Sequence, residues 1–230
     1  MSCHVERPLD DAAWGAFAQL QARRPGGFEI AALMRPPAEG ESESLWLARA
    51  RIAAAHGPLG QHTHWGGPEQ ARPTGGDPAA TVRAQAEWLR GRGLEPRLFA
   101  GGGWYMDERV AATLAELGYA DCTATAFRPS YLAPGAPRLS LAEPARLRLG
   151  ERTLLELPAT HSLGMAARAA LRRLPGYVHV YFHDTDLLDA RRRRALELAL
   201  RIIGRRRRPA RLDQIGAEAE RDFSAVASAP

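Results

Sequence analysis

Short apolar segments alternate with amphipathic segments along most of the chain, and this alternation strongly restricts its fold. The apolar segments have the length of buried strands, and the segments between them place apolar side chains on one face of a helix. The expected strands are residues 2–6, 28–34, 58–62, 98–100, 119–123 and 177–182, and the expected helices begin near residues 10, 42, 77, 107, 164 and 188. This order predicts an α/β fold with a mostly parallel sheet.

Residues 125–144 and 146–157 interrupt the alternation. The first segment is rich in proline and small residues, so we expect a long surface loop. The second has two short apolar runs around Gly150 and Glu151, which predicts a hairpin. We expect a single domain over residues 1–216 and a flexible tail over residues 217–230, because the end of the chain lacks apolar periodicity.

The composition is that of an ordinary globular protein. The 230 residues are 45% hydrophobic and 25% charged, which suffices for a sizeable core. No apolar run approaches the roughly 18 residues of a membrane span, and the first residues lack a secretory-signal pattern, so we expect a cytoplasmic protein. Cys3 and Cys122 are too few and too far apart in sequence for a disulfide scaffold, and we expect buried thiols.

Arginine carries all of the positive side-chain charge, since the chain contains no lysine. Two runs of four arginines occupy residues 191–194 and 205–208, and runs of this kind can bind phosphate backbones. The first run lies within a helical pattern, and the second lies where that helix should end and where cations suit the helix dipole. A solvated helix face is therefore favoured over a nucleic-acid surface, and we expect no nucleic-acid partner.

Two of the seven histidines, His62 and His64, stand two residues apart at the end of the third expected strand. In an extended backbone, side chains at i and i+2 point the same way, so both imidazoles can address one ion while Thr63 faces away. A hydrolytic zinc site has about three protein ligands and an open position for water. The pair therefore predicts a metal site with one ligand still to be found.

Further polar side chains follow two other expected strands. His4 and Glu6 share one face of the first strand, and His183 and Asp184 follow the last. Functional groups of α/β folds gather at the carboxyl ends of the strands, so we expect these residues near the histidine pair. A single histidine or acid in such a place is more often structural, but the coincidence at three strand ends favours a site.

These motifs resemble those of the polysaccharide deacetylase family, the NodB-homology group of carbohydrate esterase family 4. Residues 60–64 resemble the family's metal-binding histidine motif, residues 99–105 with 118–121 its third and fourth motifs, and residues 181–184 its fifth. The resemblance runs from about residue 2 to residue 215. It implies a distorted (β/α)7 barrel that hydrolyses acetyl groups from amino sugars with a divalent metal ion.

Three departures from the family pattern bear on the chemistry. The family's second metal-binding histidine would fall at Gly66, so His64 would take its place. His4 stands where the family has an acidic general base, which leaves Glu6 as the third ligand. Ala100 stands where the family has an arginine beside that base. The last two changes are consistent with each other, because a cation would oppose the protonated form of a histidine base.

The resemblance gives each candidate residue a role. The expected metal ligands are Glu6, His62 and His64, the expected catalytic residues are His183, His4 and Asp121, and the expected substrate contacts are Trp65, Trp104, Tyr105 and His161. His183 would protonate the leaving amine, oriented by Asp121 or Asp184, with the motif match favouring Asp121. His4 would accept a proton from water. Zinc is the expected ion, with cobalt or nickel as alternatives.

Two functions follow as hypotheses. The first is a metal-dependent deacetylase-like hydrolase that removes an acetyl group from an N-acetylated sugar or glycoconjugate. The second is a catalytically impaired protein of the same fold that binds carbohydrate or serves as a scaffold, because His4 replaces the usual base. Signatures of other enzymes, such as a Gly-x-Ser-x-Gly elbow or a phosphate loop with Gly-Lys, are missing from the sequence.

Overall fold

A computed structural model describes residues 1–132, 135–136 and 138–215, so the tail expected at residues 217–230 lies outside the described residues. The strands are β1 (Ser2–Val5), β2 (Ala31–Met34), β3 (Leu59–Thr63), β4 (Leu98–Gly101), β5 (Ala120–Asp121), β6 (Ala145–Leu149), β7 (Arg152–Glu156), β8 (His161–Ser162) and β9 (Val180–His183). The α-helices are α1 (Asp11–Arg23), α2 (Glu43–His56), α3 (Pro78–Arg90), α4 (Glu108–Leu117), α5 (Leu163–Ala169) and α6 (Ala190–Arg206). Short 3-10 helices are η1 (Pro25–Gly27), η2 (Gly102–Trp104) and η3 (Asp184–Leu188).

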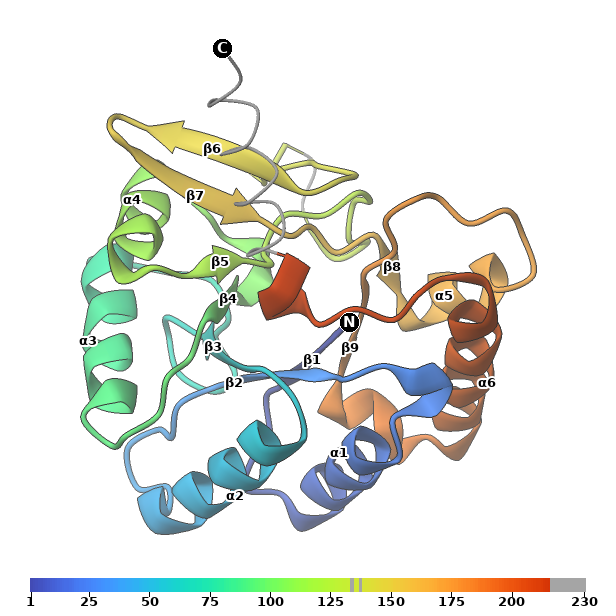
Figure 1. Cartoon of the computed structure of the whole chain (residues 1–230). Coiled ribbons are helices and arrows are strands. Elements are labelled where there is room, and N and C mark those ends of the chain that lie inside the picture. The colour runs from blue at the N-terminus through green and yellow to red at the C-terminus, as the bar shows by residue number, and fades with distance from the viewer. Residues whose placement is uncertain (133–134, 137, 216–230) are drawn as a thin grey trace.

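One curled sheet holds all of these strands, in the order β6-β7-β5-β4-β3-β2-β1-β9-β8. Neighbouring strands from β7 to β8 are parallel, and β6 is antiparallel to β7 in a hairpin. The helices surround the curled sheet on its outer side (Figure 1). The predicted α/β class, the mostly parallel sheet and the distorted barrel are confirmed.

Caps fix several helices at the residues that the sequence indicated. Asp77 and Asp107 precede α3 and α4, and their carboxylates accept hydrogen bonds from backbone amides of the first turn. Gly118 ends α4 with a φ of 71°, in the left-handed region that favours glycine. These local signals made the central helices predictable.

The structure differs from the sequence-based expectation near the end of the sheet. The helix expected over residues 164–174 ends at Ala169, and the strand expected over residues 177–182 is β9, which begins at Val180. The two-residue strand β8 was not expected. A strand of two residues is too short to show any hydrophobic alternation, so nothing in the sequence marked it.

The alternation of side chains along β1 separates the core from a polar interior. Cys3 and Val5 pack in the main apolar cluster together with Phe17 of α1 and Leu200 of α6. His4 points the other way, and its ring lies 4.5 Å from the ring of His62, centroid to centroid. Because side chains alternate between the two faces of a strand, the same short strand stabilises the core and supplies the interior.

Helix α6 has the solvated face that the sequence indicated. Its buried side chains are Leu196, Ala199, Leu200 and Ile203, and most arginines of the run at residues 191–194 are exposed. Among the described residues, no helix has both the length and the apolar character needed to cross a bilayer.

Two carboxyl groups, those of Asp121 and Glu156, lie side by side in the core. They are register partners on β5 and β7, and both residues are fully buried. Burial raises the pKa of both groups, and the neighbouring Asp121 raises the pKa of Glu156 further. The pair therefore keeps a proton at neutral pH, because two adjacent buried carboxylates cannot both be charged.

Helix α6 approaches η1 so closely that two glycines are needed at the contact. A β-carbon added at Gly204 would lie 2.2 Å from the carbonyl oxygen of Gly26. Gly26 itself has a φ of 69°, which side-chain-bearing residues rarely adopt. This contact fixes the position of α6 against the connection between α1 and β2.

Replacing Gly204 with alanine should lower the free energy of unfolding by about 1–3 kcal/mol, because the added methyl group would overlap the Gly26 carbonyl. The matched control is Gly15→Ala in α1, where an added β-carbon meets nothing within 4 Å. This control should raise the free energy of unfolding by roughly 0.5–1 kcal/mol, because alanine favours the helix. Urea unfolding measures both variants, and a Gly204→Ala protein as stable as wild type would contradict the contact.

Replacing Glu156 with glutamine should remove part of the pH dependence of stability. The folded-state pKa of Glu156 is raised, so its contribution to stability is present below the unfolded value of about 4.3 and is lost as the pH rises above it. Glutamine does not ionise, so the variant should be more stable than wild type by roughly 1–3 kcal/mol near pH 8. Urea unfolding of wild type and Glu156→Gln across the pH range is the measurement. If the difference in stability between the two proteins does not shrink toward pH 4, the raised pKa of Glu156 is refuted.

Candidate functional site

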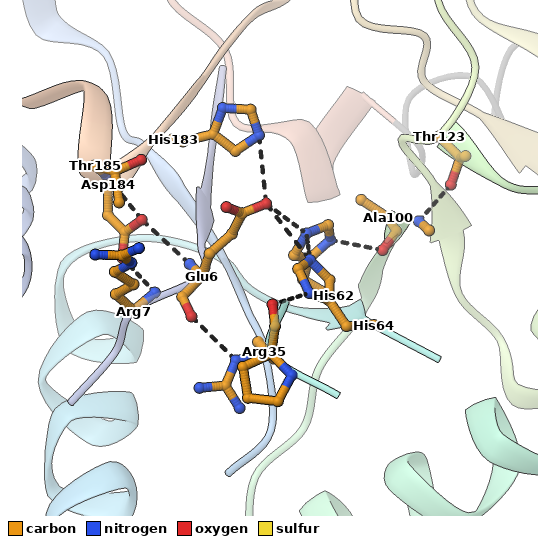
Figure 2. A network of polar contacts seen from close by, with 12 residues as sticks. Glu6, Arg7, Arg35, His62, His64, Ala100, Thr123, His183, Asp184 and Thr185 are labelled. Atoms are coloured by element: carbon orange, nitrogen blue, oxygen red, sulfur yellow. Dashed lines mark hydrogen bonds and ion pairs between the residues drawn. The ribbon is translucent and has the colours of Figure 1, made fainter. Parts of the chain in front are cut away.

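The carboxyl ends of β3, β1 and β9, with β2 between β3 and β1, bring the candidate residues together. Register pairs His4 on β1 with His183 on β9, and Glu6 follows β1 directly. His62 lies in β3 and His64 follows it. Figure 2 shows the Glu6 carboxylate between the ring of His183 and the rings of His62 and His64.

The ligand atoms of Glu6, His62 and His64 lie close enough to hold one metal ion. The two histidine Nε2 atoms are 3.1 Å apart. Oε1 of Glu6 lies 3.7 Å from Nε2 of His62 and 3.5 Å from Nε2 of His64. One ligand atom from each of the three residues falls within 4.8 Å of the others. Two imidazole nitrogens and a carboxylate oxygen are a donor set that suits zinc and similar transition metals.

Backbone carbonyls orient the two histidines of this group. Nδ1 of His62 lies 2.9 Å from the carbonyl oxygen of Ala100, and Nδ1 of His64 lies 2.9 Å from that of Pro68. A carbonyl accepts only, so each Nδ1 carries the proton and each Nε2 keeps its lone pair. Partners of this kind fix the tautomer and the ring direction of histidines that bind metals.

Glycine is required beside this group. A β-carbon added at Gly102 would lie 2.7 Å from the carbonyl oxygen of Thr63 and 2.8 Å from Cδ2 of His64. Segment 101–104 therefore packs directly against the histidine pair, which gives a physical reason for the three consecutive glycines at residues 101–103.

The Glu6 carboxylate is charged in this setting. Burial would raise its pKa, but the neighbouring imidazoles of His62, His64 and His183 outweigh burial and hold the pKa well below its usual range. The Glu6 side chain remains 30% exposed, so the charge is not sealed in the core.

His183 lies on the other side of the Glu6 carboxylate, with its Nε2 3.6 Å from Oε1. Its Nδ1 is 3.6 Å from Oδ2 of Asp186, which also accepts a hydrogen bond of 3.0 Å from the His183 backbone amide. Burial lowers the pKa of His183, but Asp186 and Glu6 outweigh burial, and the net shift is upward. His183 is not part of the group of three ligand atoms.

The carboxylate beside Nδ1 of His183 is that of Asp186, whereas the sequence analysis expected Asp121 or Asp184. Asp184 instead accepts hydrogen bonds from the backbone amides of Glu6 and Arg7, at 3.2 and 2.9 Å. These bonds hold the segment that carries Glu6 (Figure 2). Asp186 lies in η3, three residues after His183, and side chains at this spacing in a helix are neighbours. This spacing was the signal in the sequence that could have identified Asp186 as the partner of His183.

Asp121 lies in the core pair and reaches the site through one residue. The Thr123 hydroxyl donates to Oδ1 of Asp121 at 2.6 Å and accepts from the Gly101 amide at 2.7 Å. The register partner of Asp121 is Glu156, which the sequence analysis did not single out. A direct catalytic role for Asp121 stays a prediction.

His4 is buried among aromatic rings and next to the group of three ligand atoms. Its ring lies 5.4 Å from the rings of both His183 and Tyr181, centroid to centroid. Burial, followed by the nearby His62 and His183, lowers the pKa of His4 well below its usual value. The imidazole of His4 is therefore neutral at physiological pH.

A pocket of about 220 Å³, here called the metal pocket, opens onto these groups. Its described lining is His4, Glu6, His62, Ala71, Gly101, Gly103, Trp104, Tyr131 and His183. Trp104 is the one expected substrate contact in this lining, and Tyr131 was missed. Tyr131 belongs to the long loop expected at residues 125–144, where sequence alone gives no position for a side chain.

Trp104 is held in an unusual conformation beside the histidines. Its φ is 59°, which costs strain for a residue with a side chain. Its ring packs edge-on against Tyr181 at 4.8 Å and lies 5.7 Å from the ring of His4, centroid to centroid. The surrounding aromatic rings thus stabilise the strained residue at the pocket wall.

The other expected substrate contacts lie outside the described lining of the metal pocket. Trp65 donates from Nε1 to the carbonyl oxygen of Pro78 at 3.1 Å and packs edge-on against Tyr105 at 5.1 Å. The Tyr105 hydroxyl donates to Asp107 at 2.6 Å. His161 lies in β8, with its Nδ1 2.8 Å from the hydroxyl oxygen of Thr160. Substrate contact by these three residues stays a prediction.

Comparisons with known proteins identify a shared fold. No family model matches the chain, and no curated protein matches its sequence. A crystal structure from Mycobacterium smegmatis, provisionally assigned as a polysaccharide deacetylase, superposes with a TM-score of 0.61 and 16% identity over 94% of this chain and 79% of that chain. The 4-alpha-glucanotransferase from Thermococcus litoralis gives a TM-score of 0.57 and 12% identity over 95% of this chain and 38% of that chain. The chain therefore has the α/β fold of the polysaccharide deacetylases, as its motifs predicted.

Proposed function

We propose that this protein is a metal-dependent hydrolase that removes an acetyl group from an N-acetylated sugar or glycoconjugate. The observation that carries the proposal is the arrangement of Glu6, His62 and His64 as a potential ligand set, with His183 next to it in one pocket. The fold shared with a deacetylase-like structure supports the reaction class. Because one fold hosts many activities, the proposal rests on the site more than on the fold.

A divalent ion would be held by Oε1 of Glu6 and by Nε2 of His62 and His64, and when bound it would polarise an acetyl carbonyl and acidify a water. Zinc is the ion that this donor set favours, and cobalt or nickel could replace it. The low pKa of Glu6 keeps this ligand deprotonated, as ion binding requires.

His183 and His4 are the proposed proton carriers. The raised pKa of His183 favours its protonated form, which suits a group that donates a proton to the leaving amine. The neutral His4 can accept a proton from water. Asp186 would position His183 through its contacts with Nδ1 and with the backbone amide.

The walls of the metal pocket suggest how a sugar would bind. Trp104 and Tyr131 offer aromatic surfaces beside the histidines, and Trp65, Tyr105 and His161 would contact more distant parts of a longer substrate. The Gly101 amide already donates to Thr123, so the amides of Gly102 and Gly103 remain as candidates to stabilise an oxyanion.

A second function is a catalytically impaired protein of this fold that binds carbohydrate or serves as a scaffold. His4 in place of a carboxylate base favours it, because burial makes this imidazole a weak base. Both functions keep the pocket, and they differ in turnover.

The His62→Ala and His64→Ala variants should lose binding of zinc, cobalt and nickel. Removal of a ligand should weaken affinity by more than the roughly 10–100-fold that loss of an outer hydrogen-bond partner causes. Elemental analysis after reconstitution and dialysis is the measurement. His56→Ala, a histidine at the end of α2, is the control and should keep the ion. Wild-type protein that retains none of the three ions would sink the metal site.

The His183→Ala variant should lose about 10²–10⁴-fold in kcat for release of acetate while it still binds the ion. Asp186→Asn should show a smaller loss, because it removes only the charge that orients His183. Acetate release from acetylated chito-oligosaccharides and other acetylated sugars measures both. If wild type and His183→Ala release no acetate but bind sugar equally well, the binding function is supported and the hydrolase is rejected.

A further inference from the structure

A second hollow, of about 500 Å³, opens beside His183 between α5 and the start of α6. Its lining includes His183, Asp186, Arg191 and Arg192, and we call it the arginine hollow. His183 also lines the metal pocket, so the two hollows share this side chain. The two helices lie next to each other in Figure 1.

The two arginines of the hollow differ in what they bind. Nη1 of Arg192 donates to Oδ1 of Asp186 at 2.6 Å, so its charge is offset. The guanidinium of Arg191 has no hydrogen-bond or ion-pair partner among the residues that the structure describes, and Arg191 is exposed. The carboxylate of Asp189, the N-cap residue of α6, accepts from the backbone amides of Arg191 and Arg192. The hollow therefore holds one guanidinium, that of Arg191, without a hydrogen-bond or ion-pair partner among the described residues.

The position of these arginines is unfavourable for the helix itself. Arg191 and Arg192 lie in the first turn of α6, which contains no acidic residue. The helix dipole disfavours cations at this end and favours them at the other. Arg192 gains the ion pair with Asp186, but Arg191 has no such partner among the described residues, and a local rule broken in this way commonly marks a functional position.

The second arginine run is used in a different way. Arg206 donates to the carbonyl oxygens of Ala170 and Arg172, both at 2.6 Å. Arg207 donates to the carbonyl oxygen of Pro175 at 2.9 Å. These bonds connect the end of α6 to the segment after α5, so the run serves the fold. The two runs are thus not one continuous surface for a nucleic acid.

We propose that the arginine hollow is a subsite for an anionic group on the substrate, a carboxylate, sulfate or phosphate on a sugar next to the acetylated one. This inference rests on the proposed function, because it extends the substrate from the metal pocket. The guanidinium of Arg191 can bind such a group with two parallel hydrogen bonds. The nearby carboxylate of Asp186 is neutralised by its ion pair with Arg192, so it does not repel an anionic ligand. The protein would therefore prefer acidic glycans over neutral ones.

Two oligosaccharides of equal length test this preference. Hyaluronan oligosaccharides carry N-acetylglucosamine and a carboxylate sugar in alternation, whereas chito-oligosaccharides carry N-acetylglucosamine alone. Isothermal titration calorimetry with the zinc-loaded protein should show tighter binding of hyaluronan. The Arg191→Glu variant should weaken hyaluronan binding about tenfold more than chito-oligosaccharide binding, and 0.5 M salt should reduce the preference in wild type by roughly the same factor.

Arg205→Glu is the matched control, because it makes the same charge change on the same helix in its last turn. It should leave both affinities and any acetate release unchanged. Equal effects of Arg191→Glu and Arg205→Glu, or equal affinity of wild type for both oligosaccharides, would overturn the subsite. Displacement of hyaluronan by a single-stranded oligonucleotide that depends equally on both arginines would also overturn it, in favour of a nucleic-acid surface.

The outcomes separate this subsite from the proposed function. If the protein binds hyaluronan through Arg191 but releases acetate from no substrate, the subsite stands and the hydrolase fails. If the protein deacetylates chito-oligosaccharides and Arg191→Glu has no selective effect on hyaluronan, the hydrolase stands and the subsite fails.

Discussion

The charge on Glu6 is the constraint on which the arrangement of this site depends. One carboxylate oxygen lies within 3.7 Å of nitrogens from three histidines, which come from two strands. The backbone amides of Glu6 and Arg7 donate hydrogen bonds to Asp184, so the Glu6 carboxylate extends from a segment that is held in place. Loss of this one charge would remove the anionic donor that stands beside the Nε2 lone pairs of His62 and His64.

Much of this arrangement could be predicted from the sequence, because its determinants are local. The alternation of side chains along β1 and β3 determines which side of the sheet His4, His62 and His64 face. Capping residues such as Asp77 and Asp107 determine where the helices begin. Tyr131 and Glu156 could not be assigned in this way. Their positions depend on how a long loop and a hairpin fold back on the sheet, and no local periodicity encodes that geometry.

The walls of the metal pocket are less constrained than its base. The base consists of strand residues such as His62, whereas Trp104 lies in a short 3-10 helix and Tyr131 in a loop. Strand ends tolerate little change, but loops accept insertions and substitutions. A deacetylase-like structure and a glucanotransferase share this fold at 16% and 12% identity, so the sheet alone does not fix an activity.

The sheet is open, with β6 and β8 at its two edges among the described strands. An exposed edge offers unpaired amides and carbonyls to any other chain. Here β6 carries the exposed Arg148, and β8 is only two residues long. Charge on one edge and brevity at the other both discourage a second molecule from adding a strand. The protein can thus resist edge-to-edge aggregation without closing its barrel.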